Sequence, residues 1–133
     1  MIQVERMVRN LCDMVQIPSE SGEEQKFIKC LYRKFTNDLS ANCYIDDYGN
    51  FIARIPACSC SSLTPLFFAM HADTVKLGKE IQLKVVDGFV YSSGDTILGV
   101  DCKAGIAKFI EAIQSAISDA VSILTNSKKE DNQ

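Results

Sequence analysis

The chain has 133 residues, a length that suits one small domain with a buried core, and 47% of them are hydrophobic. Its net charge of -3 at pH 7, without a cluster of Lys and Arg, gives no electrostatic reason to expect nucleic acid or an anionic membrane as a partner. No apolar run approaches the length of a membrane span, and the charged start of the sequence lacks the apolar region of a signal peptide. We therefore predict a cytoplasmic protein.

The cysteines are even in number, but in the cytosol we expect them to stay reduced. Cys58 and Cys60 are too close together for a zinc knuckle, and no second pair completes four ligands. We interpret the six as buried or loop thiols without function. They are Cys12, Cys30, Cys43, Cys58, Cys60 and Cys102.

Two amphipathic helices are predicted in the first part of the chain. Apolar residues recur every three to four positions over residues 2–16, and this helix ends before Ile17-Pro18 because the residue before a proline avoids the helical conformation. Ser21 and Glu24 form the capping-box pattern of a second helix, which fades at Asn37-Asp38. Its apolar face carries Phe27, Ile28, Leu31, Tyr32 and Phe35.

Two hairpins and a third helix are predicted further along. Residues 42–45 and 50–55 are expected to form strands joined by a turn in which Gly49 takes positive φ. Residues 81–86 and 89–91 flank the turn dipeptide Asp87-Gly88. A helix from Lys103 places four isoleucines on one face, at positions 106, 110, 113 and 117.

Between the hairpins, residues 66–70 form the apolar run Leu-Phe-Phe-Ala-Met, which ends at His71, the only histidine, and is followed by Asp73. Such a run without polar alternation predicts a strand buried on both faces, as in parallel or mixed sheets covered by helices. The polar pair would then lie at the carboxyl end of the strand, where open α/β sheets bind ligands. Taken alone, the segment favours a core or surface histidine that has no function.

His71, Asp73 and Asp101 are the candidate site residues. A neutral imidazole can bind a metal ion, and a carboxylate two residues on can hold the orientation of the ring. Asp101 follows a glycine-rich stretch and opens a helix, so a helix N-cap is its alternative role. One His and one Asp are only half of a tetrahedral catalytic zinc site, which needs three protein ligands and a water.

Four sequence blocks together resemble the opening of the two-zinc exopeptidase and deacylase family, which includes peptidase T, the glutamate carboxypeptidases, acetylornithine deacetylase and succinyl-diaminopimelate desuccinylase. The peptidase T branch is favoured by the Gly-Asp-Thr-Ile-Leu-Gly stretch and by the Lys-Ala-Gly that follows. The resemblance covers residues 1 to about 118. The blocks are residues 16–24, 47–50, 71–75 and 93–105.

The resemblance implies an α/β fold with a mixed, largely parallel sheet flanked by helices. Residues 1–118 would be the N-terminal portion of a zinc-peptidase catalytic domain, and residues 119–133 the end of a helix and a polar tail. It assigns His71 as the first zinc ligand, Asp73 as the catalytic-site carboxylate that orients it, and Asp101 as the bridge between two zinc ions. The block 103–105 would fix the bridging loop, with Gly105 allowing close packing. The implied reaction is amide hydrolysis of short peptides.

The sequence also departs from the family pattern. Cys102 stands where a second carboxylate often follows the bridging aspartate, and since that position is not a family ligand we expect it to tune the site at most. The family's general base, its further acidic ligands and its final histidine have no counterpart, because no Glu-Glu pair follows residue 105 and the chain has one histidine. We therefore expect the 133 residues to be inactive alone and, with an unpaired sheet edge, marginally stable or self-associating.

Two other functions stay open at this stage. The chain could be a non-catalytic module, a truncated product that binds a partner through its exposed sheet edge and needs no metal. A thiol activity built on Cys102 with His71 is the second alternative, although no third catalytic group is evident.

Overall fold

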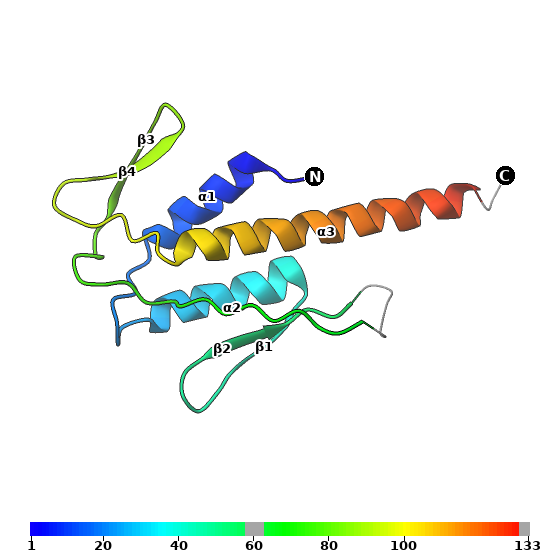
Figure 1. Cartoon of the computed structure of the whole chain (residues 1–133), viewed down its shortest axis with the longest axis horizontal. Coiled ribbons are helices and arrows are strands. Elements are labelled where there is room, and N and C mark those ends of the chain that lie inside the picture. The colour runs from blue at the N-terminus through cyan, green and yellow to red at the C-terminus, as the bar shows by residue number, and fades with distance from the viewer. Residues whose placement is uncertain (58–62, 131–133) are drawn as a thin grey trace.

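The structure is a computed structural model that describes residues 1–57 and 63–130, apart from the side chains of Leu124 and residues 126–130. Cys58 and Cys60 lie outside the described residues. Figure 1 shows α1 and α2 on either side of the first half of α3, with one hairpin beside α2 and the other beyond the end of α1 and the start of α3. The elements are α1 (Val4–Val15), α2 (Gln25–Leu39), β1 (Asn42–Ile45), β2 (Phe51–Arg54), β3 (Gln82–Val86), β4 (Phe89–Ser93) and α3 (Lys103–Glu130).

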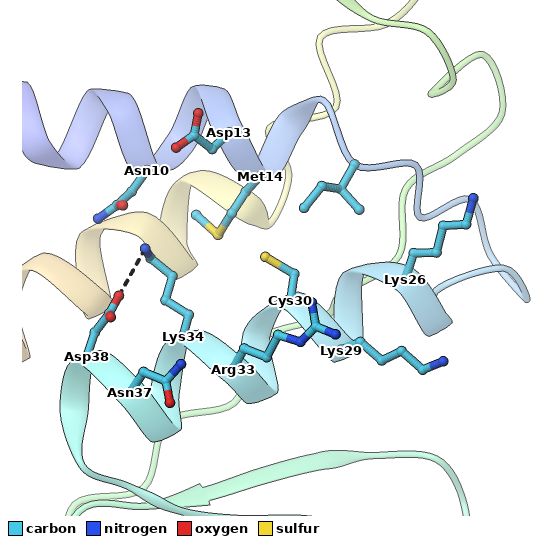
Figure 2. Close-up of a pocket in the computed structure, with 11 residues that line it drawn as sticks. Asn10, Asp13, Met14, Lys26, Lys29, Cys30, Arg33, Lys34, Asn37 and Asp38 are labelled. Carbon is cyan, nitrogen blue, oxygen red and sulfur yellow. Dashed lines mark hydrogen bonds and ion pairs between the residues drawn. The ribbon is translucent and has the colours of Figure 1, made fainter.

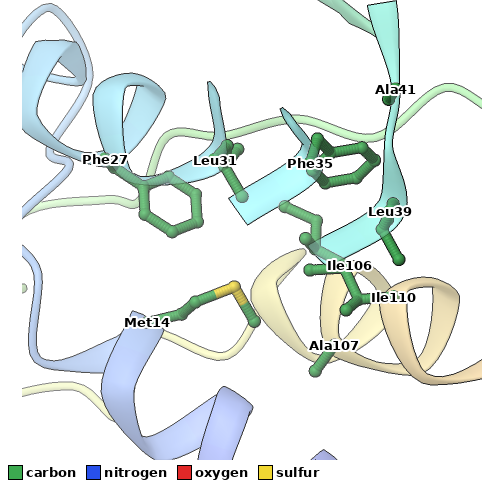
Figure 3. Close-up of a cluster of buried hydrophobic side chains, with 9 residues drawn as sticks. All are labelled: Met14, Phe27, Leu31, Phe35, Leu39, Ala41, Ile106, Ala107 and Ile110. Carbon is green, nitrogen blue, oxygen red and sulfur yellow. The ribbon is translucent and has the colours of Figure 1, made fainter. Parts of the chain in front are cut away.

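The core forms where the apolar stripes of the three helices meet. The predicted faces of the second and third helices are confirmed, because Phe27 and Ile110 are fully buried and Ile113 and Ile117 pack against the core. Tyr32 is half-exposed and lies at the margin, where its ring contacts Phe51. Burying a large apolar side chain contributes about 1.5–3 kcal/mol, so this cluster (Figure 3) is the main source of stability. Its members are Met14, Phe27, Leu31, Phe35, Leu39, Ala41, Ile106, Ala107 and Ile110.

Two buried charged side chains of α3 form hydrogen bonds with α1 and with residues next to it. The carboxylate of Glu111 accepts hydrogen bonds from Nε and Nη2 of Arg6, at 2.7 and 2.9 Å, and from the backbone amide of Gln3, at 2.7 Å. The hydrogen bonds from Arg6 lower the pKa of Glu111 to about 2. Lys103 Nζ donates to the carbonyls of Met14 and Ile17, 3.0 and 2.7 Å away, at the end of α1, and burial lowers the pKa of Lys103 to about 8.

Both predicted hairpins are confirmed. Strands β1 and β2 pair antiparallel, and Gly49 has φ of 87° in the turn between them. Strands β3 and β4 also pair antiparallel, and Asp87 and Gly88 have φ values of 51° and 78°. Positive φ at both central residues is the geometry that favours Asp-Gly in a two-residue hairpin turn.

The predicted largely parallel sheet is not confirmed for the described residues. The described part of the chain holds two separate sheets of two antiparallel strands each, and a single parallel bridge joins Glu20 to Thr74. The architecture is a small mixture of helices and antiparallel strands. Within the same part of the chain, no helix has the length and apolar character needed to cross a membrane.

The prediction of a buried strand over residues 66–70 is wrong. The segment is unpaired, and Leu66 and Phe67 are 84% and 90% exposed. Phe68 makes contact with α3, where its ring lies 4.8 Å from that of Phe109. A strand exists only through hydrogen bonds to a neighbour, and no described strand pairs with these residues.

The capping-box prediction is also wrong. Helix α2 begins at Gln25, and Glu24 precedes it in a helical conformation without a side-chain cap. The carboxylate of Glu24 instead accepts a hydrogen bond from the amide of Gly22 at 2.6 Å, and the hydroxyl of Ser21 donates to Asp73. The pattern was ambiguous because a serine hydroxyl in a turn can bond to any acceptor that the fold places beside it.

Candidate metal centre

The three residues singled out in the sequence come together at one site. His71 and Asp73 follow the segment 66–70, and Asp101 lies two residues before the start of α3. The Nε2 atom of His71 lies 3.3 Å from Oδ1 of Asp101, a contact between residues 30 positions apart. The site is open to solvent, since the side chains of His71 and Asp101 are 50% and 94% exposed.

Asp73 lies against the Nδ1 side of the His71 ring. Nδ1 of His71 lies 3.0 Å from the backbone carbonyl of Asp73 and 3.2 Å from its carboxylate atom Oδ1. Both of these oxygens can only accept, so Nδ1 carries a proton and donates it. The other ring nitrogen, Nε2, is then directed at Asp101 and is the atom available to a metal ion.

The electrostatics of the site favour a positive charge between the imidazole and the carboxylates. Burial lowers the pKa of His71, but the hydrogen bonds to Asp101 and Asp73 outweigh it and raise the pKa above its usual value. The hydrogen bond from Ser21, together with the one from His71, holds the pKa of Asp73 below its usual range. Because both ring nitrogens face acceptors, His71 needs either a second proton or a cation beside Nε2.

Ser21 is a site residue that sequence reasoning missed. Its hydroxyl donates to Oδ2 of Asp73 at 2.5 Å, while Oδ1 of the same carboxylate is in contact with His71. The resemblance block 16–24 contained this serine, but its capping-box pattern supplied a local explanation. A contact across 52 positions leaves no local signal in a single sequence.

The start of α3 places a second group of donors near His71. The carboxylate of Asp101 faces the imidazole rather than the backbone of α3, so the N-cap alternative is not what the structure shows. The Sγ atom of Cys102 lies with the ligand atoms of His71 and Asp101 in a group within 4.8 Å of one another. A Cβ at Gly105 would approach that sulfur to 3.0 Å, so the glycine leaves room for the side chain of Cys102.

These donors fit part of a zinc site. Bonds of about 2.0–2.1 Å at tetrahedral angles place two ligand atoms about 3.4 Å apart. The separation of 3.3 Å between Nε2 of His71 and Oδ1 of Asp101 matches that spacing. Imidazole and carboxylate are common zinc ligands in proteins, and a carboxylate placed as Asp73 is here is the partner that a zinc-binding histidine normally has.

A groove of about 610 Å³ lies elsewhere, between α1 and α2 (Figure 2). Its polar lining is mainly positive side chains of α2, of which Lys34 is paired with Asp38 at 3.2 Å. None of the metal-centre residues lines it. The groove is therefore separate from the candidate site.

No protein-family model matches the chain. The chain is 34% identical over 122 residues to the uncharacterized protein YqjE of Bacillus subtilis (strain 168). This match covers 86% of the chain but 32% of YqjE.

Two solved structures are similar to the fold. The aminopeptidase PepT from Bacillus cereus ATCC 10987 has a TM-score of 0.84 and 36% identity, and a tripeptidase from Staphylococcus aureus subsp. aureus Mu50 has a TM-score of 0.80 and 27% identity. Each match covers 90% of this chain and 34% of the other protein. The chain thus spans about a third of the length of the proteins it matches, and its fold is similar to the matched parts of the aminopeptidase and the tripeptidase.

Proposed function

We propose that this chain contributes part of the zinc centre of a peptidase T-like metallopeptidase that hydrolyses amide bonds of short peptides. The observation that carries the proposal is the convergence of His71, Asp73 and Asp101 in a segment whose fold matches an aminopeptidase and a tripeptidase. The cytoplasm remains its predicted location.

The chain's own residues have distinct parts in this proposal. His71 binds metal through Nε2, Asp73 keeps Nδ1 protonated and the ring aligned, and Asp101 supplies carboxylate oxygen at 3.3 Å from Nε2. The complete site would hold two zinc ions, with Asp101 between them. Bound zinc supplies Lewis-acid polarisation of the scissile carbonyl and a water of lowered pKa.

We further propose that the isolated 133 residues are inactive. Hydrolysis needs a general base within reach of the water, and the described residues hold a single His, Asp and Cys group that could bind a metal. Asp73 is already engaged with Ser21 and His71, so it is not free to take a proton from water. The base and the remaining ligands must come from further polypeptide.

A chimera tests the proposal directly. The part of this chain that matches the Bacillus cereus aminopeptidase replaces the corresponding 34% of that protein, and release of an amino acid from a tripeptide is measured. We expect the chimera to hydrolyse the tripeptide, and His71→Ala and Asp101→Ala to reduce its rate by about 100-fold or more, since each removes a metal ligand. The isolated chain should release no amino acid under the same conditions.

The matched control is Asp119→Asn, because this carboxylate is exposed on α3 and pairs with the N-terminal ammonium rather than with the site. It should leave the rate of the chimera within about twofold, as expected of a surface substitution. A folded chimera without activity, or an active one that tolerates Asp101→Ala, would contradict the proposal.

A non-catalytic binding role is the second candidate, and the exposed segment 66–70 favours it. Leu66 and Phe67 are almost fully exposed in a segment that pairs with none of the described strands, a surface suited to pairing with a strand of a partner. Its partner would be the remaining part of such a peptidase, produced as a separate polypeptide. Binding that is abolished by Phe67→Asp and indifferent to Asp101→Ala would favour this role over the metal centre.

A further inference from the structure

Ser21 stands at the outer end of a chain of hydrogen bonds that leads to the candidate metal position. Its hydroxyl donates to Oδ2 of Asp73 at 2.5 Å, Oδ1 of Asp73 lies 3.2 Å from Nδ1 of His71, and Nε2 of His71 faces Asp101. Each oxygen of the Asp73 carboxylate thus has its own partner. With both oxygens held, the carboxylate plane cannot rotate away from the imidazole.

The backbone around Ser21 is tied to the same segment. The amide of Ser21 donates to the carbonyl of Thr74 at 3.1 Å, and the amide of Thr74 donates to the carbonyl of Ser19 at 2.8 Å. Thr74 and Ser19 are buried, with 5% and 0% exposure. The hydroxyl of Ser21 is therefore placed beside Asp73 by two backbone hydrogen bonds rather than by its own side-chain preference.

We propose that Ser21 is a positioning residue of the metal centre, which locks the Asp73 carboxylate so that His71 presents Nε2 to the metal ion. This inference rests on the proposed function and names a residue that acts through Asp73 without touching metal or substrate. Removing a carboxylate that orients a metal-binding histidine typically weakens metal binding by about 10–100-fold. Ser21 acts on His71 only through Asp73, so we expect its removal to weaken metal binding by about 10-fold, at the lower end of this range.

The test compares Ser21→Ala, Ser21→Thr and Ser122→Ala in the full 133-residue chain. Zinc affinity is measured by calorimetric titration with alkylated cysteines, and folding by circular dichroism and thermal unfolding. Thr keeps the hydroxyl, and Ser122→Ala removes a comparable exposed serine bond, the one to the carbonyl of Ser118 on α3. We expect about 10-fold weaker zinc binding in Ser21→Ala, and affinities within about twofold of wild type in the two others.

A second readout does not depend on metal. Because the chain has one histidine, the ring signals of His71 are assigned without further work, and nitrogen NMR of the metal-free protein reports which ring nitrogen carries the proton. At a pH high enough for the imidazole to be neutral, wild type and Ser21→Thr should hold the proton on Nδ1. Ser21→Ala should show a mixture of both neutral forms while its unfolding temperature stays unchanged, a result that a merely structural serine would not produce.

The outcomes separate this inference from the proposed function. Unchanged zinc affinity and an unchanged His71 spectrum in Ser21→Ala would overturn the role of Ser21 and leave the metal centre standing. If wild type binds no zinc, the proposed zinc function of the isolated segment fails, and the His71 spectrum alone decides the role of Ser21. Should Ser21→Ala not fold, Ser21→Gly also removes the hydroxyl, and the same two results decide.

Discussion

Removing Arg6 should destabilise the protein, because it leaves the buried carboxylate of Glu111 without its cation. The Glu111 side chain is 1% exposed, and Arg6 reaches it with two hydrogen bonds of 2.7 and 2.9 Å. Lowering the pKa of Glu111 from 4.5 to about 2 corresponds to about 3 kcal/mol. Since Arg6 itself is 32% exposed and the Gln3 amide remains, we expect Arg6→Met to cost about 2 kcal/mol at neutral pH.

The same pair gives the destabilisation a defined pH dependence. The pKa of Glu111 is lower in the folded than in the unfolded state, so its stabilisation is present above pH 4.5 and is lost as the pH falls towards 2. Urea unfolding of wild type and Arg6→Met, followed by circular dichroism, should show this difference in the free energy of unfolding at neutral pH and a much smaller difference at about pH 3.

The exposed pair of Lys34 and Asp38 serves as the control (Figure 2), since their side chains are 22% and 38% exposed. Asp38→Asn should change the free energy of unfolding by about 0.5 kcal/mol or less. If Arg6→Met unfolds at the same urea concentration as wild type, or if the difference persists undiminished in acid, the reasoning about this ion pair is refuted.

Three further predictions concern single residues. Cobalt bound to the chain should lack a thiolate charge-transfer band and keep its affinity in Cys102→Ser, because the resemblance gives this cysteine no ligand role; a band lost in the variant would contradict that. Phe67→Lys should reduce self-association in sedimentation while changing unfolding by about 0.5 kcal/mol or less, as Phe67 is 90% exposed. Gly99→Ala should lower the free energy of unfolding more than Gly88→Ala. Both glycines have positive φ (67° and 78°), but only a Cβ at position 99 would approach another side chain, that of Ile81 at 3.2 Å. Equal losses in the two variants would exclude a steric contribution.

The helices and hairpins could be predicted because their signals are local. The apolar stripe of α2 and the Asp-Gly turn between β3 and β4 depend on residues within one or two turns of each other, and both predictions are confirmed. The run at 66–70 carries an equally strong apolar signal but is exposed here. Whether such a run becomes a buried strand depends on neighbours that the run itself does not encode.

The candidate site could be predicted in part. The resemblance singled out His71, Asp73 and Asp101, and the structure brings these three together, while their roles stay predictions. Ser21 escaped notice because its partner is 52 positions away and its local pattern suggested a helix cap. The contact required the backbone pairing of Ser21 with Thr74, which is tertiary structure.

The central claim is that His71 and Asp101 form a metal-binding half-site in this chain. Isothermal titration of zinc into the metal-free protein, with its cysteines alkylated so that thiols supply no signal, measures this most directly. We predict binding of zinc that is lost in Asp101→Ala and retained in the surface variant Asp119→Asn. Absence of binding in the wild type, or equal binding in Asp101→Ala, would contradict the claim and direct the search to a partner protein instead of a metal.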